Sequence, residues 1–303
     1  MPIMILFNPS AGAGHNPATE APHLRETLFA HGLKADVVVT TGPSLAAAAA
    51  EAVREHPRML IVAGGDGSVS TVASILSGTQ IPLGIIPLGS RNSFARDLGI
   101  PVDRALAAKV IAAGNTRDVD VAEVNGRIFV NHSSIGIYPA PVRRGEWQAR
   151  LGKGRLLSIF QAIIHALRRS PVLHVQFRTS GGHAIERRTP FVFVGNGNYE
   201  LDLLAIGRRT AIDNGRLGLY VANRPGRLGL LLLAARSLMR RLDQTEDFYM
   251  TQLAQLRVES RSRRLTVALD GEIIRLVPPL NYRVHPRALR VIVPVPAAPA
   301  AVD

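Results

Sequence analysis

A glycine-rich stretch, Gly64-Gly65-Asp66-Gly67-Ser68, has the residue types best suited to a chemical task. It lies between the apolar residues 60–63 and a segment that is helix-compatible from Val69 onward, which predicts a strand, a turn and a helix. Glycines let backbone N–H groups approach a ligand, and a helix N-terminus adds unpaired donors and a favourable dipole. The stretch therefore predicts a phosphate site. A tight connection that needs glycine only for its geometry is the alternative.

The charges of this stretch indicate which kind of phosphate ligand it can bind. Asp66 would repel a bare phosphate, and the stretch has no lysine of the kind found in P-loops. A divalent cation or a nearby arginine must therefore balance the charge. Because the chain has no cysteine, its metal ligands are limited to carboxylates, carbonyl oxygens and nine histidines. This set favours a hard cation, and we expect a nucleotide bound with magnesium.

Two more loops of similar composition follow predicted strands. Asn8-Pro9-Ser10-Ala11-Gly12-Ala13-Gly14 comes after the apolar residues 3–7, and Pro87-Leu88-Gly89-Ser90-Arg91-Asn92 comes after residues 83–86. In an open parallel sheet, ligands bind outside the carboxyl ends of the strands. We therefore expect the three loops to converge on one nucleotide.

The elements that must position these loops read as an α/β domain followed by a β domain. Short β-favouring runs alternate with helix-compatible segments over the first ~120 residues, which predicts a parallel sheet. The strands are expected at 3–7, 35–40, 59–63 and 83–86, and the helices at 16–31, 44–56 and 68–76. The first domain is predicted over 1–121, and the segment 284–296 could return to complete it.

Closely spaced strand-like runs follow Asp120 and predict an antiparallel β domain over 122–283. The runs lie at 121–124, 127–132, 173–178, 191–194, 217–221, 256–260 and 265–269. Two helix-like insertions, at 151–169 and 226–242, interrupt them. The fold class is therefore α/β plus β, with a Rossmann-like first domain.

Composition limits the functional class. With 47% hydrophobic and 19% charged residues, the chain of 303 residues is globular and not disordered. No apolar run reaches the ~20 residues that span a bilayer, and the N-terminus has no secretory pattern, so we expect a cytoplasmic protein. The net charge of +13 predicts attraction to polyanions, but no nucleic-acid-binding motif is evident.

The three loops together resemble the ordered motifs of the diacylglycerol kinase and sphingosine kinase catalytic family. The resemblance continues through Asp120 and the segment Phe129-Val130-Asn131-His132-Ser133-Ser134-Ile135-Gly136, and it ends at Leu269-Asp270-Gly271-Glu272. It implies a bacterial-type lipid kinase that uses ATP and Mg2+. It also implies an N-terminal nucleotide domain, a C-terminal β-sandwich and an active site in the cleft between them.

The resemblance also implies roles for single residues. The residues that match the nucleotide-contacting set are Asn8, Thr40, Gly64, Gly65, Asp66, Gly67, Ser68 and Ser90, with Asp66 acting through phosphate-bound magnesium. Glu272 matches the family's proton acceptor, and Asp270 would position it or the metal. By itself, Asp270-Gly271 is a good hairpin turn, and both interpretations can hold. Asp120 matches a member of the active-site charge network, although an exposed carboxylate at a domain junction is an equally good interpretation.

Three positions depart from the family pattern. Ser93 stands where many bacterial diacylglycerol kinases carry Asp, which puts substrate or metal handling in doubt. Asn214 stands where some members carry an Asp that binds a structural magnesium, and an amide is a weaker ligand than a carboxylate. The segment Gly195-Asn196-Gly197-Asn198-Tyr199 keeps the family's Gly-Asn-Gly but loses the glycine-rich run that follows it.

A basic segment is the candidate for membrane docking. Between Val142 and Ser170, seven Lys or Arg residues accompany one acidic residue, Glu146, with Trp147 and several aliphatic residues interleaved. Basic side chains near an anionic leaflet each gain roughly 1 kcal/mol, so peripheral association with a lipid surface is expected. A solvated basic face over an ordinary core helix is the alternative. His132, His165 and His174 lack metal-site spacing and are assigned no role.

The predicted function is therefore transfer of the ATP γ-phosphate to a lipid hydroxyl, with diacylglycerol or a related glycerolipid or sphingoid lipid as acceptor. A kinase of a soluble substrate, as in NAD kinases, also uses a Gly-Gly-Asp-Gly loop and is one alternative. A catalytically silent regulator that binds lipid or nucleotide is another. The sequence leaves open which lipid is used and whether the chain forms a homodimer.

Overall fold

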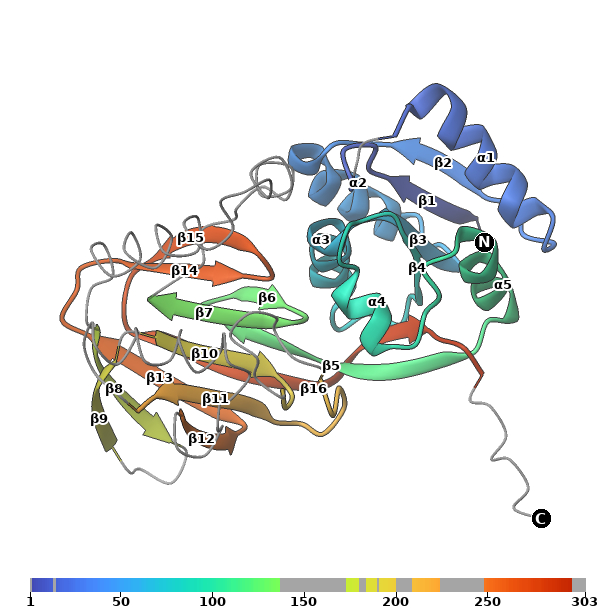
Figure 1. The fold of residues 1–303 in the computed structure, drawn as a ribbon. Helices are drawn as coiled ribbons and strands as arrows, with labels where there is room; N and C mark the ends of the chain where they lie inside the picture. The colour runs from blue at the N-terminus through green and yellow to red at the C-terminus, as the bar shows by residue number, and fades with distance from the viewer. Residues whose placement is uncertain are drawn as a thin grey trace, which may run out of the picture. The chain divides into compact units, whose positions relative to one another are not determined.

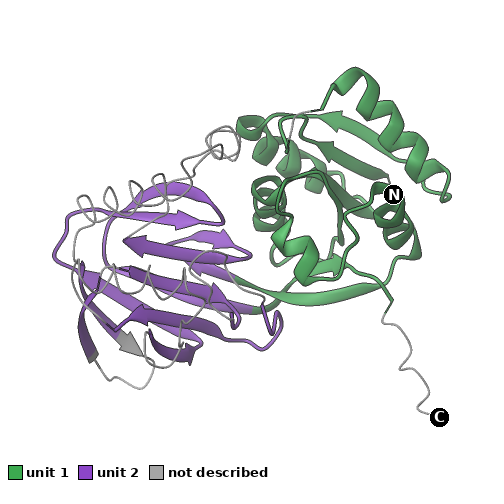
Figure 2. Ribbon diagram, viewed as in Figure 1, with its two compact units in different colours: residues 1–121, 286–303 green, residues 122–285 purple. Residues whose placement is uncertain are grey.

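The computed structural model describes residues 2–12, 15–136, 173–179, 184–189, 191–199, 209–223 and 248–295. The chain divides into two compact units, one formed by Met1–Val121 with Pro286–Asp303 and the other by Ala122–His285 (Figure 2). Two strands, β5 (Thr116–Val124) and β16 (Leu280–Ile292), contain the points where the chain passes from one unit to the other. We refer to the two parts as unit 1 and unit 2.

Unit 1 is a parallel sheet covered by helices (Figure 1). Its sheet order is β2-β1-β3-β4-β16, and the pairs along it are parallel. The elements are β1 (Ile3–Phe7), α1 (Pro17–Phe29), β2 (Asp36–Val39), α2 (Gly42–Arg54), β3 (Met59–Gly64), α3 (Asp66–Leu76), β4 (Leu83–Pro87), α4 (Ser93–Asp97) and α5 (Arg104–Ala113). α1 packs against α5, and α2 packs against α3.

Sequence explains why these elements form. The strand β3 is buried along its whole length, as expected for a central strand of a sheet covered on both faces. The helix α1 begins after Asn16, whose side chain accepts a hydrogen bond from Ala18 N, and Pro17 occupies its first turn. The helix α5 begins after Asp103, which accepts from Leu106 N in the same way. The sequence did not predict α4 and α5.

Unit 2 consists of two sheets of mainly antiparallel strands packed face to face (Figure 1). One sheet has the order β16-β13-β8-β9, with the β5–β6 hairpin beside β16, and the other has the order β12-β11-β10-β7-β14-β15. The new elements are β6 (Arg127–Phe129), β7 (His132–Gly136), β8 (Leu173–Thr179), β9 (Ala184–Thr189), β10 (Phe191–Asn196), β11 (Leu217–Ala222), β12 (Phe248–Leu253), β13 (Gln255–Ser260), β14 (Leu265–Leu269) and β15 (Glu272–Leu276).

The core of unit 2 lies between these two sheets. Phe129, Val175 and Val258 come from one sheet and Ile135, Val194 and Val267 from the other, and all are almost completely buried in one cluster. Alternate residues of each strand supply this cluster, as expected for a β-sandwich. The predicted class, an α/β domain followed by an antiparallel β domain, is therefore confirmed.

One strand prediction was wrong. The run predicted as a single strand over 127–132 is two strands, β6 and β7, which are separated at Val130 and Asn131. The run is apolar and β-favouring, so its local pattern does not show the break. The two predicted insertions, at 151–169 and 226–242, and the basic segment lie outside the described residues. None of the helices in the described ranges is both long and apolar enough to cross a lipid bilayer.

The core of unit 1 gives a stability prediction with a matched control. Phe7 is fully buried among the residues that join β1 to α1 and β3, whereas Phe29, at the end of α1, is 68% exposed. We expect Phe7→Ala to lower the free energy of unfolding by about 3–5 kcal/mol, because it removes buried apolar contacts and leaves a cavity. Phe29→Ala should change it by less than about 0.5 kcal/mol. Denaturant unfolding followed by circular dichroism measures both, and equal losses would contradict this description of the core.

Candidate active site

The three predicted loops begin at neighbouring strand ends of unit 1. Asn8 N donates a hydrogen bond to Ala63 O at 3.0 Å, and Leu88 N donates to Gly64 O at 2.9 Å. β1, β3 and β4 are adjacent and parallel, so their carboxyl ends lie along the same edge of the sheet. The loops that follow them therefore start side by side.

Two close approaches hold the loops against one another. Gly12 has a φ of +62°, and a Cβ added to it would lie 2.5 Å from Leu88 O. A Cβ added to Gly89 would lie 2.6 Å from Gly65 Cα. Side chains cannot occupy these positions without displacing backbone, so glycine is needed for the contacts themselves. The contacts join the loop after β4 to both of the other loops.

Polar side chains complete this cluster of loops. Asn8 Nδ2 donates to Ser68 Oγ at 2.9 Å, which links the first loop to the first turn of α3. Thr40 follows β2; its N donates to Phe7 O at 2.8 Å, and its hydroxyl lies 3.0 Å from Ser44 Oγ in α2. Ser90, the member of the predicted nucleotide set in the loop after β4, is exposed. The structure thus gathers Asn8, Thr40, residues 64–68 and Ser90 along one edge of one sheet.

The N-terminus of α3 is the feature most suited to an anion. Its N-cap residue is Gly65, and no side-chain hydrogen bond caps the helix. Asp66 lies in its first turn, and one of its carboxylate oxygens accepts from Phe94 N at 3.3 Å, so Asp66 also fixes the start of α4. An N-terminus without a side-chain cap has N–H donors and a dipole that favour a phosphate. The residues present therefore fit a magnesium-bound nucleotide.

Asn92 has a structural role in this site that the predicted set omitted. Its φ is +51°, its Oδ1 accepts from Gly89 N at 2.9 Å, and its Nδ2 donates to Gly89 O at 2.8 Å. The side chain thus closes the turn that carries Ser90. Asparagine is among the few residues that adopt this backbone conformation readily, so its place three residues after Gly89 was a usable signal.

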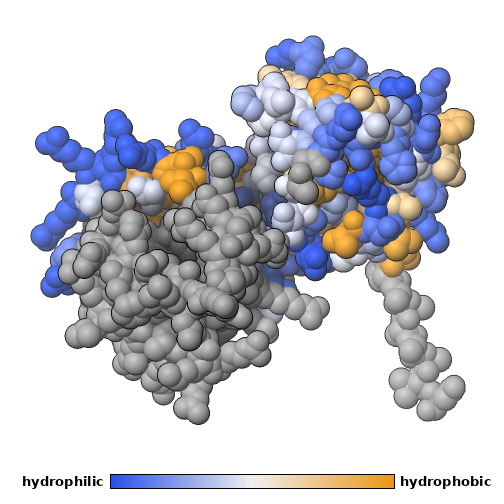
Figure 3. All heavy atoms as spheres, turned by 45° about the horizontal axis from the view of Figure 1, so that its top comes forward, coloured by the Kyte–Doolittle hydropathy of each residue, from blue (hydrophilic) through white to orange (hydrophobic). Residues whose placement is uncertain are grey.

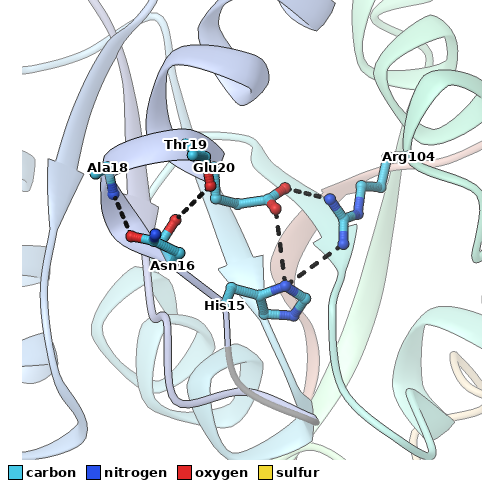
Figure 4. Close-up of polar contacts among 6 residues, drawn as sticks. All are labelled: His15, Asn16, Ala18, Thr19, Glu20 and Arg104. Carbon is cyan, nitrogen blue, oxygen red and sulfur yellow. Dashed lines mark hydrogen bonds and ion pairs between the residues drawn. The ribbon is translucent and has the colours of Figure 1, made fainter.

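His15, Glu20 and Arg104 form a second feature that the sequence did not reveal (Figure 4). Arg104 donates to Glu20, and His15 Nδ1 lies 3.8 Å from the Glu20 carboxylate and 3.5 Å from Arg104 Nη2. His15 N donates to Pro9 O at 2.8 Å, so the group holds the far end of the loop after β1. Arg104 is 84 residues from Glu20, and no local pattern could pair them.

The predicted catalytic residues of unit 2 lie in the hairpin between β14 and β15. Leu269 pairs with Glu272, and the two residues between them, Asp270 and Gly271, both have positive φ, as a type I′ turn requires. The hairpin prediction is therefore confirmed. Glu272 is exposed at the first position of β15. The Asp270 carboxylate accepts hydrogen bonds from three backbone N–H groups, those of Val130, Asn131 and His132, at 2.8 to 3.0 Å.

Two further predicted acidic or metal positions accept hydrogen bonds from backbone N–H groups. Asp120 is 2% exposed, and its Oδ1 accepts from Arg287 N at 2.8 Å, so the interpretation as an exposed carboxylate was wrong. Asn214 is exposed, and its Oδ1 accepts from Arg216 N at 3.1 Å. Within the described ranges, no group of three or more His, Asp and Glu side chains is arranged as a metal site. Magnesium at Asn214 stays a prediction.

The group formed by His15, Glu20 and Arg104, which we call the His15 anchor, gives a prediction about nucleotide binding. Arg104→Gln removes the charge that holds Glu20, and we expect it to weaken the predicted nucleotide binding about fivefold, because a partly exposed ion pair is worth roughly 1 kcal/mol. Arg54 is a matched control, since it forms an exposed ion pair with Glu51 on α2. Titration with a fluorescent ATP analogue measures both variants. Equal affinities of Arg104→Gln and Arg54→Gln would show that the anchor does not shape the loop.

Comparison with known proteins agrees with the family resemblance and the fold class predicted from the sequence. Residues 2–124 match the family model of the diacylglycerol kinase catalytic domain. The diacylglycerol kinase of Bacillus subtilis is 36% identical over 140 residues, which are 44% of this chain and 45% of that protein. An Escherichia fergusonii protein named as probable lipid kinase YegS is 38% identical over 122 residues, which are 37% of this chain and 41% of its own. The matched regions thus span less than half the length of these two relatives.

A solved structure extends the likeness to both units. The structure of a presumed diacylglycerol kinase from Bacillus anthracis is 26% identical to this chain, and the match has a TM-score of 0.75 and covers 97% of each chain. The family match includes all three loops of unit 1, and the structural match reaches the hairpin that carries Glu272. Residues 2–124 of this protein therefore match the diacylglycerol kinase catalytic domain, and the fold of the chain is similar to that of a presumed diacylglycerol kinase.

Proposed function

We propose that this protein is a lipid kinase that transfers the γ-phosphate of ATP to a lipid hydroxyl, with diacylglycerol or a related glycerolipid or sphingoid lipid as acceptor. The observation that carries the proposal is the backbone contact of three glycine-containing loops around the N-terminus of α3, which has no side-chain cap. Phosphate groups bind at such sites through backbone N–H groups and the helix dipole. A nucleotide supplies the phosphate in a family whose relatives are named as kinases.

The residues of unit 1 define how the nucleotide would be held. Asn8 and Ser68, which are joined by a hydrogen bond, provide polar groups beside the phosphates, and Ser90 provides an exposed hydroxyl on the loop that Asn92 closes. Asp66 adds negative charge at the same helix N-terminus. Magnesium bound with the nucleotide would supply the positive charge that offsets Asp66 and the phosphates.

The residue proposed to accept the proton is Glu272. Its carboxylate would take the proton of the lipid hydroxyl as that oxygen forms a bond to the γ-phosphorus, while the bond from the γ-phosphorus to the β–γ bridging oxygen breaks and ADP leaves. A base must reach the acceptor hydroxyl, and Glu272 has an exposed side chain. Asp270 already accepts three backbone hydrogen bonds, which suits it to anchoring the turn and not to taking a proton.

Exposed apolar side chains in and just after β15 offer surface to the acyl chain of a lipid acceptor. Ile273, the residue after Glu272 in β15, is 51% exposed, and Val277 is 60% exposed. On the described parts of the molecule, Figure 3 shows apolar surface in small areas among hydrophilic residues. Because successive side chains of a strand alternate between the two faces of a sheet, Ile273 points to the face of β15 opposite to Glu272, so an acyl chain at Ile273 would lie across the strand from the carboxylate. Docking to an anionic bilayer through the basic residues between Val142 and Ser170 stays a prediction.

A phosphate-transfer assay tests the proposal. The protein is incubated with γ-labelled ATP, magnesium and mixed lipid vesicles, and the organic and aqueous phases are counted separately. We expect label in the organic phase, and a loss of about 100-fold or more in Glu272→Gln, because an amide cannot accept the proton and general base catalysis contributes 10²–10⁴-fold. Glu259→Gln, which removes a carboxylate from β13, is the matched control and should keep full activity.

The other outcomes separate the competing functions. Label that enters only a soluble acceptor supplied alongside the vesicles would identify a kinase of a small polar substrate. Nucleotide binding without any transfer would identify a regulator that has kept the fold of a kinase. Equal organic-phase label in Glu272→Gln and wild type would leave the lipid kinase in place but remove Glu272 from its mechanism.

A further inference from the structure

The break between β6 and β7 is held by an unusually complete set of polar contacts. We call residues Val130, Asn131 and His132 the 130–132 segment. All three of its N–H groups donate to the carboxylate of Asp270: Val130 N to Oδ2 at 2.8 Å, Asn131 N to Oδ1 at 2.9 Å and His132 N to Oδ1 at 3.0 Å. A single side chain 138 to 140 residues away in sequence thus binds every amide of the segment.

The carbonyl oxygens of the segment are bound from other directions. Val130 O accepts from Asn196 Nδ2 at 3.1 Å and from Arg209 Nη1 at 2.9 Å. Asn131 O accepts from Tyr199 Oη at 3.0 Å and from Asn196 N at 2.8 Å. His132 O accepts from Asp270 N at 3.0 Å. Every peptide N–H and C=O of the segment is therefore hydrogen-bonded. The segment can move only if some of these hydrogen bonds break.

Arg209 is the charged member of this network. Its side chain is buried, with 6% of the residue exposed. Its Nη1 binds Val130 O and its Nη2 binds the side-chain Oδ1 of Asn131 at 2.7 Å, so the planar guanidinium spans two successive residues of the segment. The guanidinium carbon also lies 5.2 Å from the centre of the Tyr199 ring. A lysine ammonium has neither the fork nor the plane that these contacts use.

Tyr199 is itself fixed. The Tyr220 hydroxyl accepts from Tyr199 N and donates to Tyr199 O, both at 2.8 Å. Burial raises the pKa of Tyr220, although its hydrogen bond to Tyr199 O acts in the opposite direction, so the hydroxyl stays protonated and can do both. A Cβ on Gly197 would lie 2.1 Å from Ala211 O, which brings the Asn196–Tyr199 and Arg209 parts of the chain together. The network therefore rests on a rigid base.

We propose that Arg209 is a positioning residue for Glu272 that acts through the 130–132 segment and Asp270. This inference rests on the proposed function, in which Glu272 is the base. Asp270 begins the two-residue turn that ends at Glu272, and its carboxylate and its N–H are both bound to the segment. If Arg209 no longer binds Val130 O and the Asn131 side chain, the 130–132 segment becomes more mobile. The turn then loses the rigid backbone to which the Asp270 carboxylate is hydrogen-bonded. Glu272 then remains present but poorly placed.

The experiment removes the forked guanidinium of Arg209 while keeping the positive charge of the side chain. Arg209→Lys is compared with Arg257→Lys, a matched control in the same unit whose exposed side chain pairs with Glu259. For Arg209→Lys we expect faster hydrogen–deuterium exchange in peptides that cover 130–132 and 269–272. We also expect kcat to fall about 10- to 100-fold with the KM for ATP unchanged, because small displacements of a catalytic group have effects of this size. The control should show neither change.

A double mutant separates positioning from general damage. If Arg209 acts through Glu272, combining Arg209→Lys with Glu272→Asp should lower kcat little beyond the larger of the two single losses. Losses that multiply, or a rise in the KM for ATP equal to the fall in kcat, would overturn the proposal. Wild-type exchange in Arg209→Lys would overturn it as well. The exchange result does not depend on the substrate, so it can be judged even if the protein proves not to phosphorylate lipid.

A milder variant covers the case in which Arg209→Lys does not fold. Tyr199→Phe removes the hydroxyl that donates to Asn131 O and leaves the ring beneath Arg209. We expect the same changes in exchange and kcat, with a smaller amplitude of about three- to tenfold in kcat, since one neutral hydrogen bond contributes about 1 kcal/mol. Unchanged exchange at 269–272 in this variant would show that the network does not reach the turn.

Discussion

The close approach of backbone to backbone at Gly65 and Gly89 is the constraint on which the cluster of loops at the carboxyl ends of the strands of unit 1 depends. A side chain at Gly89 would meet Gly65 Cα at 2.6 Å, so the loops after β3 and β4 can lie together only without side chains there. The same contact brings the turn closed by Asn92 next to the first turn of α3. The helix N-terminus, the Asn8–Ser68 hydrogen bond and the Asp66 contact with α4 all lie around it.

In unit 2, buried hydrogen bonds, and not close backbone approaches, hold the segment next to the Asp270-Gly271 turn. Asp270, Asn196, Tyr199 and Arg209 converge on the 130–132 segment, which consists of the break between β6 and β7 and the first residue of β7. A buried charge is unfavourable unless it is well paired, so such a network adds less to stability than apolar packing would. Its advantage is geometric, because a fully bonded segment has one conformation. This favours an interpretation in which the network serves the placement of the Asp270-Gly271 turn.

The tertiary contacts explain why some sequence predictions succeeded. The loops after β1, β3 and β4, the parallel sheet and the Asp270-Gly271 hairpin depend on short-range patterns: apolar runs, glycines and turn residues. These patterns and the order of the motifs were enough to predict the resemblance to the kinase family and the fold class, and the comparisons confirm both the resemblance and the fold class. The strand predicted over 127–132 failed because Val130 and Asn131 have β-favouring neighbours, and only a distant carboxylate turns their amides away from a strand partner.

The sequence by itself predicted most of the strands and helices of unit 1, the resemblance to the kinase family and the candidate site residues, because local periodicity and motif order depend on neighbouring positions in the chain. Tertiary structure alone decided the partners of those residues. It paired Glu20 with Arg104, buried Asp120 against Arg287 N and placed Arg209 on the 130–132 segment. These pairs are separated by tens to more than 160 residues, and a hydrogen bond or ion pair depends on distance in space and leaves no periodic trace along the chain.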